Sequence, residues 1–184
     1  MDFATSKTKE NLAYAFAGES QATNKYSYYA SMARTEGYQQ IAAIFEETSG
    51  NEREHAKVWF KLLCNDGKTG GKVPTTLVNL ADAAAGENEE WTQMYREFAE
   101  VAREEGFLEI CALFTLVGNV EKEHEARYRK LIERIEAGEV FKNEPTTAWK
   151  CRNCGHIHIG AEPVAECPAC AHSKAYFEIR ALNY

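Results

Sequence analysis

Hydrophobic residues recur every three or four positions along four long stretches of the first 140 residues. This spacing places them on one face of a helix, so each stretch is predicted to form an amphipathic α-helix. A glycine follows the first, third and fourth stretches, and glycine is the usual residue just past a helix end. The predicted helices cover residues 6–35, 38–65, 87–105 and 107–137.

The second and third helices are joined by a long connection. Its first part, DGKTGGKVPTT, is rich in glycine and contains Pro74, which indicates a loop. Its glycines do not match the spacing of a phosphate-binding P-loop. The next part, LVNLADAAAG, is predicted to add a short helical piece to this crossover. Four long helices with one long connection form the topology of a ferritin-like bundle, so the fold class is predicted to be mainly α.

An internal repeat relates the two halves of this helical region. ARTEGYQQIAAIFEETSGNEREH (33–55) aligns without gaps on AREEGFLEICALFTLVGNVEKEH (102–124), at an offset of 69 residues. The bundle is therefore predicted to consist of two helical hairpins of common design, joined by the crossover.

Both copies of the repeat place Glu-x-x-His in the apolar stripe of the helix. Glu52 and His55 continue the stripe of the second helix, and Glu121 and His124 continue that of the fourth. Residues three positions apart lie on the same helix face, so both side chains of each pair can reach one ion.

Further glutamates stand in the apolar stripes of the first and third helices. Glu19 lies between Phe16 and Thr23, while Glu87 and Glu90 begin the stripe of the third helix. Burying an ionised carboxylate without a partner is costly, and no Lys or Arg stands in these stripes to compensate. Metal cations are the counter-charge that the pattern indicates. One Glu from each of two helices, with Glu-x-x-His from each of the other two, is the di-iron carboxylate pattern.

A single Glu-x-x-His pair has a simpler interpretation, because such pairs are common on solvated helix faces. Two copies in register, each in an apolar stripe and each preceded by a helix that carries a glutamate, favour metal ligands. Glu54 and Glu123 also recur in the repeat, but they fall outside the stripe and are interpreted as solvated.

Composition narrows the class of protein further. Of the 184 residues, 45% are hydrophobic, which is enough for a substantial core, and the formal net charge is -7. A negative chain is a poor partner for nucleic acid, whose phosphates attract basic surfaces. The first residues, MDFATSKTKENLAYAF, contain no apolar segment typical of a signal peptide or a membrane span, so a cytoplasmic location is expected.

Past Gly138 the helical pattern gives way to a linker and then to a cysteine-rich segment. Cys151-x-x-Cys154 and Cys167-x-x-Cys170 are separated by twelve residues, a spacing that suits tetrahedral coordination of zinc or a single iron by four thiolates. About 40 residues cannot bury enough surface to fold alone, so a metal is expected to hold this segment together. The predicted domains are a di-iron bundle (1–140), a linker (141–148) and a metal domain of short strands and loops (149–184).

Several segments together resemble the rubrerythrin family: FAGESQA, EREHAK, AAAGENEEW, AREEGF, and the C-terminal CRNCG, CPACAH and AYFE. Rubrerythrins are ferritin-like di-iron proteins with an appended rubredoxin-type domain. The resemblance covers essentially the whole chain and implies two non-haem irons in the bundle and one iron bound by four cysteines. The implied di-iron ligands are Glu19, Glu52, His55, Glu87, Glu90, Glu121 and His124, and the implied Fe(Cys)4 ligands are Cys151, Cys154, Cys167 and Cys170.

The resemblance also implies a use for the extra glutamate of the third helix. One iron is held by Glu90 when oxidised and by His55 when reduced, since the harder ferric ion favours a carboxylate and the ferrous ion accepts imidazole more readily. Tyr26 and Tyr95 lie on ligand-bearing helices. They are candidates for hydrogen bonding around the centre, with core packing as the alternative.

The function that the resemblance implies is a peroxidase for oxidative-stress defence. A diferrous pair can release the two electrons that hydrogen peroxide needs to become two waters, and an Fe(Cys)4 centre can supply electrons singly. The family implies reduced rubredoxin or an NAD(P)H-dependent reductase as donor. It also implies a homodimer in which the rubredoxin domain of one subunit lies near the di-iron site of the other.

Two other classes of function remain open from the residues. The first is an iron-oxidising or iron-storing ferritin-like protein, which would need no attached electron-transfer domain. The second is a helical bundle with a structural zinc ribbon that recruits a partner.

Overall fold

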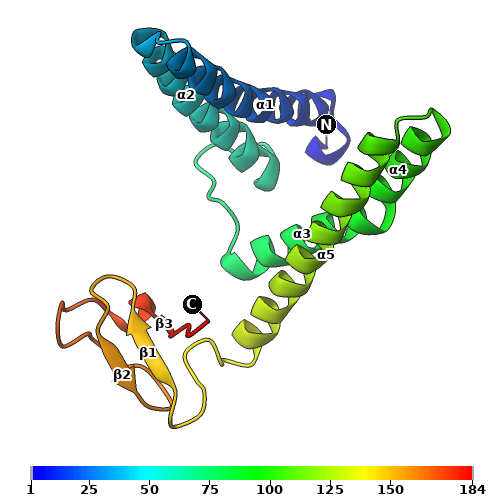
Figure 1. Cartoon of the computed structure of the whole chain (residues 1–184). Coiled ribbons are helices and arrows are strands. Elements are labelled where there is room, and N and C mark those ends of the chain that lie inside the picture. Colours follow the sequence, from blue (N-terminus) through cyan, green and yellow to red (C-terminus); the bar gives the residue numbers. More distant parts are fainter. Residues whose placement is uncertain (1, 184) are drawn as a thin grey trace. The chain divides into compact units, whose positions relative to one another are not determined.

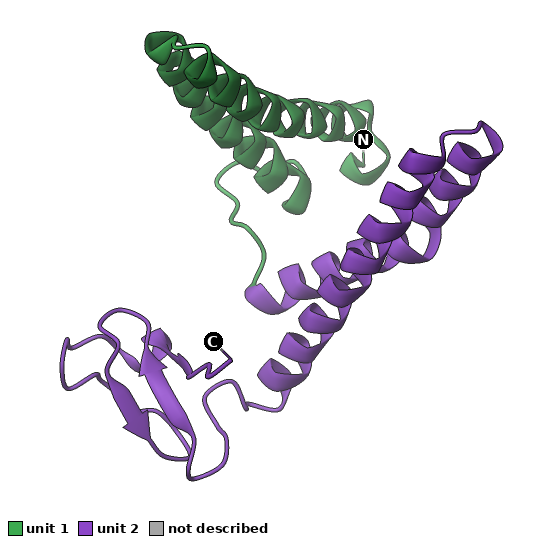
Figure 2. Ribbon diagram, viewed as in Figure 1, with its two compact units in different colours: residues 1–75 green, residues 76–184 purple. Residues whose placement is uncertain are grey.

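The computed structural model describes residues 2–183, which form two compact units divided between Thr75 and Thr76 (Figure 2). The first unit is entirely helical, and the second contains helices followed by a small sheet (Figure 1). The predicted fold class, mainly α with a small C-terminal strand and loop region, is confirmed. The domain limits drawn from the sequence stay a prediction.

The first unit is a helical hairpin. A short 3-10 turn, η1 (Phe3–Thr5), precedes α1 (Lys7–Thr35), and α2 (Gln39–Cys64) follows. Ser6 caps α1, because its hydroxyl accepts the backbone N–H of Lys9. Gly37 adopts a φ of 88° in the tight turn between the helices, a conformation that glycine reaches without strain. Such a short connection places α1 and α2 side by side and antiparallel (Figure 1).

The helices of the second unit form a similar hairpin. One arm consists of α3 (Thr76–Glu89), the turn η2 (Glu90–Met94) and α4 (Tyr95–Glu104), and the other arm is α5 (Leu108–Glu136). The piece that the sequence predicted as a separate part of the crossover is therefore continuous with the third helix, which begins at Thr76 rather than Glu87. The reason is that Gly86 alone does not interrupt an alanine-rich helix, whereas Pro74 lies just before its start.

The segment η2 is a single π turn within an otherwise α-helical arm. The backbone N–H of Tyr95 donates to the carbonyl of Glu90, five residues earlier, where an α-helix would bond four residues back. Glu19 stands eighteen residues before Gly37, but Glu87 stands nineteen before Gly106. The second hairpin therefore has one residue more than the first between this glutamate and the glycine of its turn, and the π turn accommodates that residue.

Small side chains fill the contact between the helices of each hairpin, and larger ones remain open. The buried helical residues of both hairpins are mostly alanines: Ala30, Ala33, Ala42, Ala56, Ala84, Ala99 and Ala102. By contrast, Ile41 of α2 is 47% exposed and Leu113 of α5 is 59% exposed, although both lie in the stripes predicted to face a core. Each hairpin, taken by itself, leaves part of its apolar stripe uncovered.

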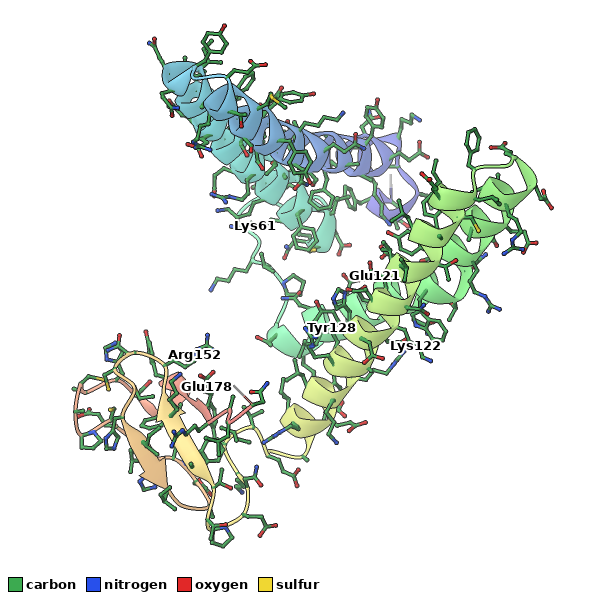
Figure 3. The ribbon with its side chains drawn as sticks, in the orientation of Figure 1. Lys61, Glu121, Lys122, Tyr128, Arg152 and Glu178 are labelled. Carbon is green, nitrogen blue, oxygen red and sulfur yellow. The ribbon has the colours of Figure 1, made fainter. Side chains whose placement is uncertain are left out.

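The C-terminal module (residues 148–179) is a three-stranded antiparallel sheet with two cysteine turns. The strands are β1 (Ala148–Cys151), β2 (Ile157–Ile159) and β3 (Phe177–Ile179), in the order β2-β1-β3, and a short turn, η3 (Lys174–Tyr176), precedes β3. Its core consists of Trp149, Cys151, Cys167 and Phe177. The side chains of Arg152 and Glu178 meet at 3.0 Å on its surface (Figure 3). Of the helices described, none has the length and apolar character that crossing a membrane requires.

One carboxylate is buried in the second hairpin with a full set of hydrogen-bond donors. Glu125 of α5 is only 7% exposed. Its Oε2 accepts the indole N–H of Trp91 at 2.5 Å, both oxygens accept from the Asn88 amide at 3.0–3.1 Å, and Oε1 accepts from Arg129 at 2.6 Å. We call these four residues the Glu125 cluster. The bonds from Asn88, Trp91 and Arg129 lower the pKa of Glu125 to about 2 against the opposing effect of burial.

This cluster should make stability depend on pH in a defined direction. The folded-state pKa of Glu125 lies below the unfolded value of about 4.3, so the ionised carboxylate stabilises the fold above that pH. The contribution is lost as the pH falls toward 2. Glu125→Gln should therefore lower the free energy of unfolding by about 1 kcal/mol or more at about pH 6, and by much less at about pH 3. Urea titrations of chelator-treated protein, followed by helical circular dichroism, measure both values, and an equal loss at both would contradict the assignment.

Candidate metal centres

The first hairpin brings three predicted ligands together. Glu19 comes from α1 and Glu52 and His55 from α2, and one ligand atom from each lies within 4.8 Å of the other two. The Nδ1 atom of His55 is 2.8 Å from Oε2 of Glu52 and 3.9 Å from Oε1 of Glu19. We call this set the first triad.

The second hairpin repeats the arrangement. Glu87 comes from α3 and Glu121 and His124 from α5, again with ligand atoms within 4.8 Å of one another. The Nδ1 atom of His124 is 2.7 Å from Oε2 of Glu121 and 3.5 Å from Oε2 of Glu87. Figure 3 marks Glu121 on α5. This set, the second triad, has the same chemistry as the first: two carboxylates and one imidazole.

Local geometry explains why both triads form. In each Glu-x-x-His pair the side chains stand three residues apart and so share one face of their helix. The neighbouring helix supplies the third side chain at a height fixed by the tight turn of the hairpin. In the second hairpin that height also depends on η2, because the extra residue lies between Glu87 and Gly106.

The carboxylates of the triads lack basic partners. In residues 2–183, none of Glu19, Glu52, Glu87 and Glu121 forms an ion pair with Lys or Arg; their only charged contacts of this kind are with His55 and His124. The Glu121 side chain is 14% exposed, so water shields it poorly. Burial raises the pKa of Glu87, and its hydrogen bond to Glu121 and the Glu121 charge raise it further.

Cations relieve this repulsion, and the donor set suits iron. Carboxylate oxygens are hard ligands and imidazole is an intermediate one, a combination that binds iron in both common oxidation states. The residues present therefore fit a di-iron centre with carboxylate and histidine ligands.

The seventh predicted ligand, Glu90, is not part of either triad. It is the first residue of η2, and its charge acts on Glu87 and on Tyr95. Burial raises the pKa of Tyr95 first, and the charges of Glu90, Glu121 and Glu87 raise it further. Tyr95 therefore lies within electrostatic reach of the second triad.

Tyr26 has a different environment. Its ring packs against Tyr29 and Phe45, with centroid distances of 6.0 and 6.2 Å. Its predicted hydrogen-bonding role near the centre stays a prediction.

The four cysteines of the C-terminal module form one cluster. Their sulfur atoms all lie within 4.8 Å of one another, with Cys151–Cys170 at 3.8 Å and Cys154–Cys167 at 3.6 Å. Four sulfurs placed tetrahedrally at about 2.3 Å from one ion would be about 3.8 Å apart, so the cluster has the size of a metal site.

Backbone conformation shapes both cysteine turns alike. Gly155 after Cys154 and Ala171 after Cys170 both adopt positive φ, 81° and 55°. A hydrogen bond from the backbone of His172 lowers the pKa of Cys170 to about 6, which favours the thiolate that a metal requires. The residues fit a rubredoxin-like iron site.

Sequence reasoning missed the Glu125 cluster. Asn88 and Trp91 had no periodic signal, and Glu125 sits one residue after a predicted ligand on a strongly charged helix. One signal was available: extended by one residue, the internal repeat pairs Glu125 with Ala56, so the two hairpins differ at this position.

Comparison with known proteins agrees with this geometry. Residues 10–132 match the family model described as rubrerythrin, and residues 149–178 match the model for the rubrerythrin rubredoxin-like domain. The chain is 49% identical to rubrerythrin of Porphyromonas gingivalis, over 97% of this chain and 92% of that one. It is 50% identical to rubrerythrin-1 of Clostridium acetobutylicum, over 97% and 96%. It is 44% identical to rubrerythrin of Nitratidesulfovibrio vulgaris, over 97% of both chains.

The core of the C-terminal module should depend on its metal. Two of its four core residues, Cys151 and Cys167, also belong to the four-cysteine cluster predicted to bind the metal, so Cys167→Ser should abolish metal binding there and expose Trp149, now 1% exposed. Metal analysis should show about one ion fewer per chain, and the Trp149 fluorescence should shift to the red. Cys111→Ser, which lies on α5 outside the cluster, is the control and should change neither. Loss of the ion with Trp149 still shielded would contradict the expectation.

Proposed function

The chain belongs to the rubrerythrin family, and from this premise we propose that it is a non-haem di-iron peroxidase that reduces hydrogen peroxide to water with electrons received through its Fe(Cys)4 centre. The observation that carries the proposal is the presence, in one chain, of two carboxylate–imidazole triads and a four-cysteine cluster. Proteins of this family are generally oxidoreductases.

The two triads together would make one di-iron centre. Three protein donors leave an iron coordinatively incomplete, and carboxylates can bridge two ions, so two triads are better satisfied together than apart. The donor sets support this, since each triad offers two carboxylates and one imidazole, which together match the di-iron carboxylate pattern. The proposed ligands are Glu19, Glu52, His55, Glu87, Glu90, Glu121 and His124.

A diferrous pair held by these residues would supply the two electrons that convert hydrogen peroxide, with two protons, into two waters. The chain would contribute charge balance and a hydrogen-bond donor. The carboxylates of the triads would compensate the charge of the ions in both oxidation states. The raised pKa of Tyr95 disfavours loss of its proton, so its hydroxyl can donate a hydrogen bond to a peroxide oxygen near the second triad.

Glu90 and His55 are proposed as alternating ligands. The Glu90 carboxylate suits the harder ferric ion, and the His55 imidazole suits the ferrous ion. The 56% exposure of the His55 side chain leaves its ring room to reorient.

The C-terminal module is an electron-transfer domain of the rubredoxin type, and it would deliver one electron at a time. Two deliveries are needed for each peroxide. We propose reduced rubredoxin or an NAD(P)H-dependent reductase as the donor. We also propose a homodimer in which the module of one subunit serves the di-iron centre of the other.

The peroxidase assignment can be tested by mixing reduced, iron-loaded protein with oxidants in a stopped-flow instrument. Hydrogen peroxide should reoxidise the iron faster than dioxygen by about a factor of ten or more. Equal rates would instead favour the alternative of an iron-oxidising ferritin-like protein. The Fe(Cys)4 centre is red only when oxidised, so its absorbance shows when it has passed its electron to the di-iron centre.

Removing the electron-transfer centre should stop repeated turnover while leaving a single turnover of the di-iron centre intact. Cys154→Ser should lower steady-state turnover with an external donor by about a hundredfold, because the di-iron centre is no longer recharged. A single reoxidation by peroxide should survive at its normal rate, since the triads are intact. Cys111→Ser is again the matched control. Undiminished steady-state turnover in the Cys154→Ser variant would refute electron delivery through the Fe(Cys)4 centre.

A further inference from the structure

We propose that Glu125 is a positioning residue: through Asn88 and Trp91 it fixes the π turn η2, and so determines where Glu90 lies relative to the second triad. The inference rests on the proposed function only in treating Glu90 as a ligand of the metal centre.

Two of the residues that donate to Glu125 flank Glu90 in the sequence. Asn88, two residues before Glu90, and Trp91, one residue after it, both donate to the same buried carboxylate. Glu90 lies on a short segment whose two sides are bound to one point of α5. Fixing both sides of a segment limits the positions that the residue between them can take.

A π turn needs such anchoring because it is an insertion. The extra residue lets α4 keep its packing on α5 while Glu87 stays beside Glu121 and His124. Since π hydrogen bonds are intrinsically less favourable than α ones, an unanchored turn could form at another place along the arm. The bonds from Asn88 and Trp91 specify η2 at Glu90–Met94.

The first hairpin provides an internal comparison. Ala56 occupies the position that corresponds to Glu125, and it is buried to the same degree, with 7% exposure. The helix beside it, α1, runs without a π turn from Lys7 to Thr35. Its nearby hydroxyls, Ser20 and Thr23, bond to carbonyls of their own helix. An alanine is therefore sufficient at this position in the hairpin that has no insertion.

Glu125 does not act as a further metal ligand. Oε1 accepts from Asn88 and Arg129, and Oε2 accepts from Asn88 and Trp91, so both oxygens are engaged by donors of the protein. Arg129 also balances its charge. The Nζ atom of Lys122, the neighbour of Glu121 on α5 in Figure 3, lies over the Trp91 ring, 5.5 Å from its centre, and its charge attracts the ring.

Two measurements on the full-length, iron-loaded protein test the proposal. The first is hydrogen exchange of the segment 88–95. Trp91→Phe and Glu125→Ala should speed its exchange by about tenfold, since each removes bonds that fix η2. The second is the reduction potential of the di-iron centre. A displaced Glu90 stabilises the ferric form less, so both variants should weaken the preference for ferric over ferrous iron by about tenfold, a rise of about 59 mV per electron.

The variant Glu90→Gln establishes that the potential change acts through Glu90. In its background, Trp91→Phe should shift the potential by less than about a third of its effect in the wild type. Glu123→Gln removes an exposed charge two residues from Glu125 and is the matched control. It should leave the hydrogen exchange of segment 88–95 unchanged. Any effect that it has on the reduction potential should be the same whether residue 90 is Glu or Gln.

The outcomes are distinct. Unchanged hydrogen exchange in Trp91→Phe overturns the proposal. Faster exchange combined with a reduction potential like that of Glu123→Gln also overturns it, because the Glu125 cluster would then have only a structural role. If Glu125→Ala does not fold, Trp91→Phe alone tests the proposal, because it removes the indole N–H but keeps an aromatic ring at this position. If the wild type binds no iron in its helices, the proposed function fails, while the exchange measurement still shows whether Glu125 fixes the π turn.

Discussion

The structure depends on carboxylates that lie close together without basic partners. Each hairpin places two partly buried glutamates beside a single histidine, with no lysine or arginine within reach of an ion pair in the part of the chain described. Such an arrangement costs free energy in the metal-free protein. It is stable when cations share the space, which explains why these residues can replace apolar ones in the stripes of amphipathic helices.

The same constraint accounts for the near symmetry of the two hairpins and for its exception. Both present the same three donors, but the second reaches them with one residue more. The π turn preserves the position of Glu87 despite that residue, and it begins at Glu90, the carboxylate that has no counterpart in the first hairpin. The extra residue and the extra carboxylate thus occur at the same place in the chain.

Much of this could be predicted from the sequence. Periodicity located the helices, and the repeat paired Glu52 with Glu121 and His55 with His124, because residues at helical spacing share a face whatever surrounds them. The cysteine spacing similarly predicted one cluster, since two short turns with two thiols each suffice to build it.

Other features depend on contacts between distant segments. The continuity of α3 with α4 was missed because helical pieces separated by one glycine read as two elements. A π turn alters the periodicity by a single residue, too little to detect in a short window. The role of Glu125 depends on donors from another helix, so in isolation it resembled the solvated Glu123. The exposure of Ile41 shows a further limit: periodicity identifies an apolar face but not what covers it.

The cysteine cluster also links a surface group to the fold of the C-terminal module. Cys151 and Cys167 are shielded inside the core that they help to form, whereas Cys154 is exposed. Of these three sulfurs, Cys154 is the most accessible to dissolved reagents, and a sulfinic or sulfonic acid there would no longer serve as a soft ligand. Modification at this one exposed position would then weaken the metal site that Cys151 and Cys167 share with the core around Trp149.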